Sequence, residues 1–188
     1  MSLNTMEHPS LLQGILKSDL KSKEKIAAMA EALLKDHSLQ AELIKTYDAG
    51  TVADKGNLLS AIALVTEQEA DWAENCLDFV FAQLNHKAPR VKWESATVVA
   101  NVAAAFPMEC AKVIPALVAN TGDPGTVVRW SAASALTAIA RNNPEAQPDL
   151  LIFFGEQVAS EQNNGVRKIY EKTLRKLMRP TRKASKKR

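Results

Sequence analysis

Apolar residues recur along the chain at the spacing of one helical face. Leu77, Val80, Phe81 and Leu84 stand at i, i+3, i+4 and i+7, which predicts an amphipathic helix. A second stripe of this kind begins at Val128, after a short loop of turn-forming residues. Few segments combine Val, Thr and Tyr, as strands do. The pattern therefore predicts an all-α protein.

The two-helix pattern returns every 37 residues. Val91-Lys92-Trp93 is matched by Val128-Arg129-Trp130 and, after one inserted residue, by Val166-Arg167-Lys168. One helix pair cannot bury its apolar stripe alone, so the pairs must stack into an α-α superhelix, or solenoid. Counting them predicts five repeats and ten helices over residues 11–36, 38–67, 69–105, 107–142 and 145–179.

One unit resembles a known repeat family. The order of features in this unit resembles that of a HEAT repeat: an apolar helix from Val113 to Val118, then Asp123-Pro124 in a loop, then Val128-Arg129 at the start of the second helix. The resemblance implies a HEAT-like solenoid domain over 1–179, with 11–36 as a terminal cap. It also implies that Asp123 and Arg129 tie successive loops together. Armadillo repeats are the nearest rival, but they carry three helices, for which 37 residues leave no room.

Positive charge gathers at the C-terminal end. Residues 166–188 hold eleven Lys and Arg against one acid, whereas residues 1–165 hold 20 acids against 13 bases. We expect residues 180–188 to be a disordered basic tail. The tail either contacts an anionic partner or only keeps the chain in solution. Its cationic residues, counted from the end of the last repeat, are Arg179, Arg182, Lys183, Lys186, Lys187 and Arg188.

Helical geometry predicts which residues of the second helices face away from the core. Steps of 100° per residue turn these positions opposite to Val91 and its equivalents. They are expected on a concave, partner-binding face and comprise Trp93, Thr97, Trp130, Ser134, Thr137, Lys168, Lys172 and Arg175. In the second repeat the same positions are small: Gly56, Ser60 and Ala63. The two tryptophans either anchor a partner or pack over a neighbouring helix.

The sequence contains no motif that is typical of a catalytic site or a metal site. Two cysteines, Cys76 and Cys110, and three scattered histidines have no metal-ligand spacing. No nucleotide-binding loop or nucleophile motif occurs, so we expect no catalytic residue, no metal and no cofactor. No apolar run approaches the length of a membrane span and no leader segment opens the chain. We therefore expect a cytoplasmic protein with reduced thiols and no membrane insertion.

These observations favour a non-catalytic HEAT-repeat scaffold that binds a protein or peptide along its concave face, aided by its basic C-terminus. The alternative is a nucleic-acid-binding solenoid. Within that alternative, the less favoured interpretation is an alkylpurine DNA glycosylase of HEAT-like fold, a family that presents tryptophans and a catalytic Asp in a basic concave groove. In that family the Trp precedes the Arg that opens the helix, whereas here it follows Lys92 or Arg129. Here Glu94 is the single carboxylate beside either tryptophan. Peptide-binding armadillo proteins place Asn four residues after Trp, where this chain has Thr97 and Ser134. The partner and the oligomeric state stay open.

Overall fold

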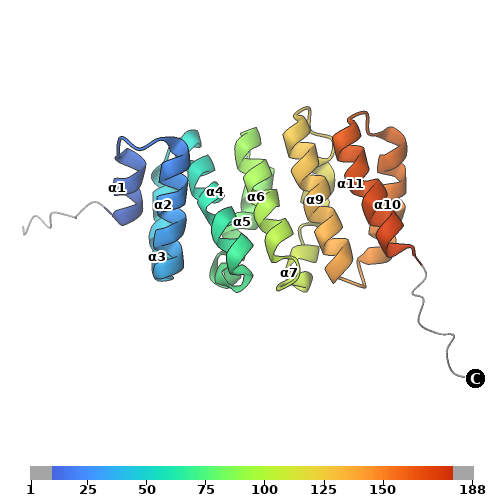
Figure 1. Cartoon of the computed structure of the whole chain (residues 1–188), viewed down its shortest axis with the longest axis horizontal. Coiled ribbons are helices and arrows are strands. Elements are labelled where there is room, and N and C mark those ends of the chain that lie inside the picture. The colour runs from blue at the N-terminus through green and yellow to red at the C-terminus, as the bar shows by residue number, and fades with distance from the viewer. Residues whose placement is uncertain (1–9, 180–188) are drawn as a thin grey trace, which may run out of the picture.

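Five helix pairs stand side by side in one row (Figure 1). A computed structural model describes residues 10–179, and no strand occurs among them. The predicted all-α solenoid is confirmed. The second helices of the pairs, here called the inner helices, are α2 (Ser22–Lys35), α4 (Val52–Gln68), α6 (Pro89–Val102), α9 (Thr126–Asn142) and α11 (Asn164–Leu177). The outer segments are α1 (Leu11–Lys17), α3 (Leu39–Ala49), η1 (Ala70–Cys76), α5 (Leu77–Ala82), η2 (Gln83–Asn85), α7 (Pro107–Ala111), α8 (Ile114–Asn120) and α10 (Gln147–Ser160).

Each inner helix packs on the next along the row, from α2 to α11. Val91, Val128 and Val166 stand near the start of α6, α9 and α11, and all three are buried. The 37-residue spacing therefore places equivalent residues in equivalent surroundings, as the repeat predicts. The stack buries a continuous apolar layer that no single pair could bury alone.

Local sequence fixes where the inner helices begin. Thr51 caps α4 by accepting a hydrogen bond from the backbone of Asp54, whose carboxylate accepts one from the backbone of Thr51 in return. Asn163 caps α11, because its side-chain oxygen accepts from the backbone N–H groups of Gly165 and Val166. Pro89 opens α6, where its missing N–H leaves no hydrogen bond unmade.

The outer segments of the third and fourth repeats are broken, which corrects the predicted count of ten helices. The described residues contain eleven α-helices and two 3₁₀ segments. Pro115 lies in the first turn of α8 and offers no N–H to the carbonyl of Ala111, so α7 ends there. The fourth repeat thus fits α7, α8 and α9 into 37 residues. The expectation that a unit of this length has no room for a third helical segment is wrong.

The third tryptophan of the chain belongs to the core. Trp72 is buried in η1, and its indole N–H donates to the carbonyl of Leu33 on α2 at 3.2 Å. The rings of Tyr47 on α3 and Phe79 on α5 meet edge to face, with their centroids 4.9 Å apart. The first contact joins the third repeat to the first, and the second joins the third repeat to the second.

Candidate partner-binding surface

Equivalent positions on α6, α9 and α11 form one surface, which we call the inner face. It comprises Trp93 and Thr97 on α6, Trp130 and Ser134 on α9, and Lys168, Lys172 and Arg175 on α11. Because these helices neighbour one another in the row and the residues share one helical register, they lie along a single side of the stack. Seven of the eight residues predicted for partner binding therefore come together on it.

Trp130 is the most exposed aromatic side chain of the described chain. Half of its surface (50%) is open to solvent, and Val127, one turn earlier on α9, is 52% exposed. Trp93 has the same register on α6 but is only partly exposed. Among the described residues, neither indole forms a close aromatic pair. The tryptophans share a face without stacking on each other, and Trp130 carries most of the accessible apolar area.

The hydroxyl groups of the inner face are bound within their own helices. Thr97 donates to the carbonyl of Trp93 at 2.9 Å, and Ser134 donates to that of Trp130 at 3.0 Å. Each hydroxyl proton is thereby occupied, so a partner finds hydroxyl acceptors rather than donors at these positions.

Thr137 does not belong to the inner face, contrary to prediction. Its side chain is 2% exposed, and its hydroxyl donates to the carbonyl of Ser134. One turn later, Arg141 reaches across to α11 and donates to the hydroxyl of Thr173 at 3.1 Å. Arg141 and Thr173 therefore join α9 to α11 near the buried Thr137.

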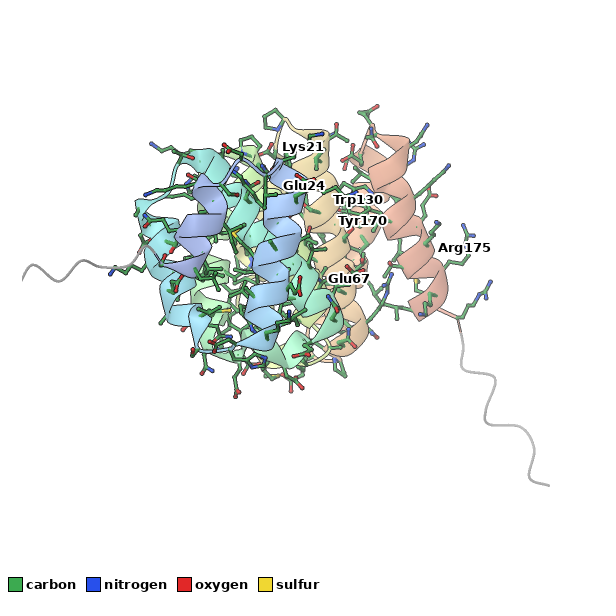
Figure 2. The ribbon with its side chains drawn as sticks, turned by 60° about the vertical axis from the view of Figure 1, so that its left-hand side comes forward. Lys21, Glu24, Glu67, Trp130, Tyr170 and Arg175 are labelled. Carbon is green, nitrogen blue, oxygen red and sulfur yellow. The ribbon has the colours of Figure 1, made fainter. Side chains whose placement is uncertain are left out.

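The basic end of the inner face is formed by α11. Lys168, Lys172 and Arg175 are all exposed, and Figure 2 shows Arg175 projecting away from the stack. The carboxylate of Glu171 lies 3.6 Å from Arg167 instead. Arg179, at the end of the described chain, is also exposed. The other predicted tail contacts, at Arg182, Lys183, Lys186, Lys187 and Arg188, lie outside the described residues.

The small residues of the second repeat do not form an open, smooth surface. Arg90 of α6 lies over Gly56, where an added Cβ would come within 2.7 Å of its Cδ atom. The guanidinium of Arg90 donates to the side chain of Asn57 at 2.9 Å. Ser60 donates to Glu94 at 2.6 Å. Gly56 and Ser60 thus make room for polar groups of the next helix, and Glu94 is held within this contact.

A second arrangement runs through the loops. Lys92 of α6 pairs with Asp123 in the next repeat at 2.9 Å, and Arg129 of α9 pairs with Glu161 at 2.9 Å. Asp123 therefore binds the base of the preceding repeat, whereas Arg129 donates to its backbone carbonyl at 3.0 Å. The resemblance predicted a loop tie at Asp123 and Arg129, but it missed Glu161.

Both loop carboxylates are held in the charged form. Burial raises the pKa of Asp123, but the hydrogen bonds from Lys92 and the backbone of Gly125 outweigh it, and the net pKa is below the usual value. Burial also raises the pKa of Glu161, but the hydrogen bond and the charge of the Arg129 guanidinium lower it. The net pKa of Glu161 is below its usual value. These ion pairs join the loop of one repeat to the inner helix of the preceding repeat.

The described residues contain two cysteines and no cluster of metal-binding side chains. Cys76 and Cys110 are free and buried, and burial raises the pKa of each thiol to about 12. Residues 10–179 contain no cluster of three metal-binding side chains. Nor does this part of the chain contain a helix with the length and apolar character needed to cross a bilayer. A cytoplasmic setting stays a prediction.

Comparison with known proteins identifies the fold class. No protein-family model matches the chain, and no curated protein does. Among solved structures, a designed armadillo repeat protein is similar to it, with a TM-score of 0.62 and 22% identity over 87% of this chain and 79% of the other. A set of computationally designed armadillo repeat proteins for modular peptide recognition matches with a TM-score of 0.63, 22% identity and the same coverage. A third, a designed armadillo repeat protein in complex with the peptide (KR)4, gives 0.63 at 18% identity, again over 87% and 79%.

These likenesses show a helical-repeat solenoid of the armadillo class of architecture. Membership of the HEAT family in particular is not shown. The broken outer segments agree with the comparison, because α7, α8 and α9 supply three helical segments in one repeat. The chain therefore shares its fold with repeat scaffolds while keeping a 37-residue unit.

Proposed function

We propose that this chain is a non-catalytic repeat scaffold that binds a protein or peptide segment across its inner face. The observation that carries the proposal is the position of Trp130. A tryptophan that is half exposed on a regular helical surface is costly to leave in water, and such residues are enriched at the centre of binding interfaces.

The surroundings of Trp130 supply the other parts of a binding surface. Val127 extends the apolar area along α9, Trp93 borders it on α6, and three cations border it on α11. An apolar centre with a charged rim is the usual composition of a protein interface. The designed neighbours named for peptide recognition support the same use of this architecture.

The contacts of Glu94, the carboxylate next in sequence to Trp93, favour a structural role for this residue. Its Oε1 accepts a hydrogen bond from Ser60 on α4 at 2.6 Å and lies 3.8 Å from Nε of Arg90 on α6. We infer that Glu94 joins α4 to α6 rather than serving as the carboxylate of a glycosylase.

Selection from a random peptide library displayed on phage tests the proposal with the full chain as bait. Selected peptides should bind the wild-type chain and lose about tenfold or more in affinity with Trp130→Ala. Ile152→Ala is the matched control, because Ile152 is 67% exposed but lies on the outer helix α10. Equal loss with both variants, or peptides indifferent to Trp130→Ala, would contradict binding on the inner face.

A further inference from the structure

Three cations on α11 have no partner within the described part of the chain. Lys168, Lys172 and Arg175 form no ion pair there, although they occur at i, i+4 and i+7 on one side of the helix. The acid of this helix, Glu171, neighbours Arg167 instead. Three like charges on one helical side repel one another, so an anionic partner there relieves a cost that the free chain bears.

The neighbouring side of α9 is apolar. Val127 and Trp130 are one turn apart and each is about half exposed. Trp130 has the same register on α9 as Lys168 on α11, and the two helices are in contact. Figure 2 shows Arg175 projecting outward from α11, whereas Tyr170 on the same helix is buried. An apolar patch and a row of cations therefore lie next to each other.

From this juxtaposition we propose that the α9–α11 half of the inner face binds an acidic peptide segment that carries one large apolar anchor residue. The anchor packs on Trp130 and Val127, and carboxylates pair with Lys168, Lys172 and Arg175. The inference deepens the proposed function and rests on it, because it names the chemistry of the partner at the same surface.

The spacing of the cations suits an extended chain. Lys168 and Lys172 are separated by four residues, or about 6 Å of helix rise. Side chains on one side of an extended peptide are about 6.6 Å apart. Acids at every second position of the peptide can therefore meet Lys168 and Lys172, whereas Arg175 lies only about 4.5 Å beyond Lys172 along the helix. The anchor residue lies on the side that faces α9.

The charge elsewhere favours a short acidic peptide over a long polyanion. Residues 36–78 contain nine carboxylates against two lysines. A nucleic acid long enough to extend along the row from α11 would approach this acidic part of the stack and be repelled. A peptide confined to α9 and α11 avoids it. The acidic peptide proposed for this chain is opposite in charge to the (KR)4 peptide in the complex of the designed armadillo repeat protein.

Fluorescence anisotropy with the full chain tests the proposal. The probe is a labelled ten-residue peptide with Glu at alternate positions and one central Leu. Its comparators are the same peptide with Lys for Glu, the same peptide with Ser for Leu, and a ten-nucleotide oligo-dT. We expect the Glu–Leu peptide to bind best and its affinity to fall as salt is raised.

Charge reversal locates the binding site. The double variant Lys168→Glu, Lys172→Glu should weaken binding of the Glu–Leu peptide by about tenfold or more, and Trp130→Ala should do the same. Lys45→Glu, an exposed lysine on the outer helix α3, should leave the affinity within about twofold.

Three results would overturn the inference. They are tighter binding of the Lys peptide, tighter binding of oligo-dT, and binding of the Glu–Leu peptide that ignores the α11 reversal. If phage-selected peptides of another composition still depend on Trp130, the acidic specificity is wrong and the proposed function stands. If no peptide depends on Trp130, both fail.

Discussion

Asp123 and Glu161 occupy the same position in consecutive repeats, and each binds the basic residue of the preceding inner helix. Each carboxylate also accepts a hydrogen bond from a backbone N–H two residues ahead, at 2.8 Å from Gly125 and at 2.7 Å from Asn163. The carboxylate therefore orders its own loop while it holds the neighbouring repeat.

Stability should fall in acid because of these two pairs. The folded chain holds the pKa of Asp123 and Glu161 below their unfolded values. Their contribution is therefore present above about pH 5 and is lost as the pH falls through the folded pKa values. Replacing both, with Asp123→Asn and Glu161→Gln, should cost about 1–3 kcal/mol per site at pH 7.

Urea denaturation followed by circular dichroism between pH 3 and pH 7 measures this effect. The difference in unfolding free energy between wild type and the double variant should shrink toward zero at the acid end. A constant difference over the whole range would show that the carboxyl charge contributes nothing. Glu156→Gln, on the exposed side of α10, serves as the control.

The third repeat lacks this pair and can be given one. His86 stands 37 residues before Asp123, and its Nδ1 accepts from the backbone of Ala88 at 3.0 Å. Burial and the charge of Lys55 lower the pKa of His86, so the ring is neutral at pH 7. His86→Asp keeps the acceptor and offers Lys55 an anion, which should raise the unfolding free energy by about 0.5–1 kcal/mol.

His86→Asn separates the charge from the hydrogen bond. It keeps a side-chain acceptor without the charge, so it should be close to wild type in stability. Thermal denaturation in low salt and in 1 M NaCl distinguishes the variants, because the gain from aspartate should vanish in high salt. A gain shared by both variants would assign the effect to loop conformation.

The stacking of helix pairs could be predicted from the sequence, because several repeats carry the same pattern at equivalent positions. Val91, Val128 and Val166 each mark the start of an inner helix, and the buried stripe follows from them. The loop carboxylate of the last repeat, Glu161, was not predicted, because one residue is inserted before it and because it is Glu where the preceding repeat has Asp. Aligning the last repeat at an offset of 38 places Glu161 opposite Asp123 and would have found it.

The inner face was harder to predict, since register gives the direction of a side chain but not what covers it. Thr137 has the same register as Trp130, yet its side chain is buried. Gly56 was expected to belong to a smooth surface, yet the long side chain of Arg90 fills the space over it. A periodic pattern within one helix does not contain the side chains of the neighbouring repeats.

Two buried tyrosines should respond differently to removal of the hydroxyl. The hydroxyl of Tyr170 is buried without a hydrogen-bond partner, whereas that of Tyr47 donates to Gln83 at 2.7 Å. Tyr170→Phe should therefore leave stability unchanged or raise it by up to about 1 kcal/mol, and Tyr47→Phe should cost about 0.5–1.5 kcal/mol. Chemical denaturation of the two variants side by side decides the matter, and a clear loss with Tyr170→Phe would reveal a partner for its hydroxyl.

The three tryptophans should separate stability from binding according to their exposure. Trp72 is buried, Trp93 is partly covered and Trp130 is half exposed. Replacement by Ala should cost about 3–5 kcal/mol at Trp72, about 2–4 kcal/mol at Trp93 and less than about 1.5 kcal/mol at Trp130, because the apolar area lost from the interior decreases in that order. The affinity for a partner should follow the opposite order, with the largest loss at Trp130. Thermal unfolding and anisotropy on the same three variants measure both quantities. If Trp130→Ala unfolds as readily as Trp72→Ala while the peptide affinity of its folded form is unchanged, then Trp130 is a packing residue and the partner binds elsewhere.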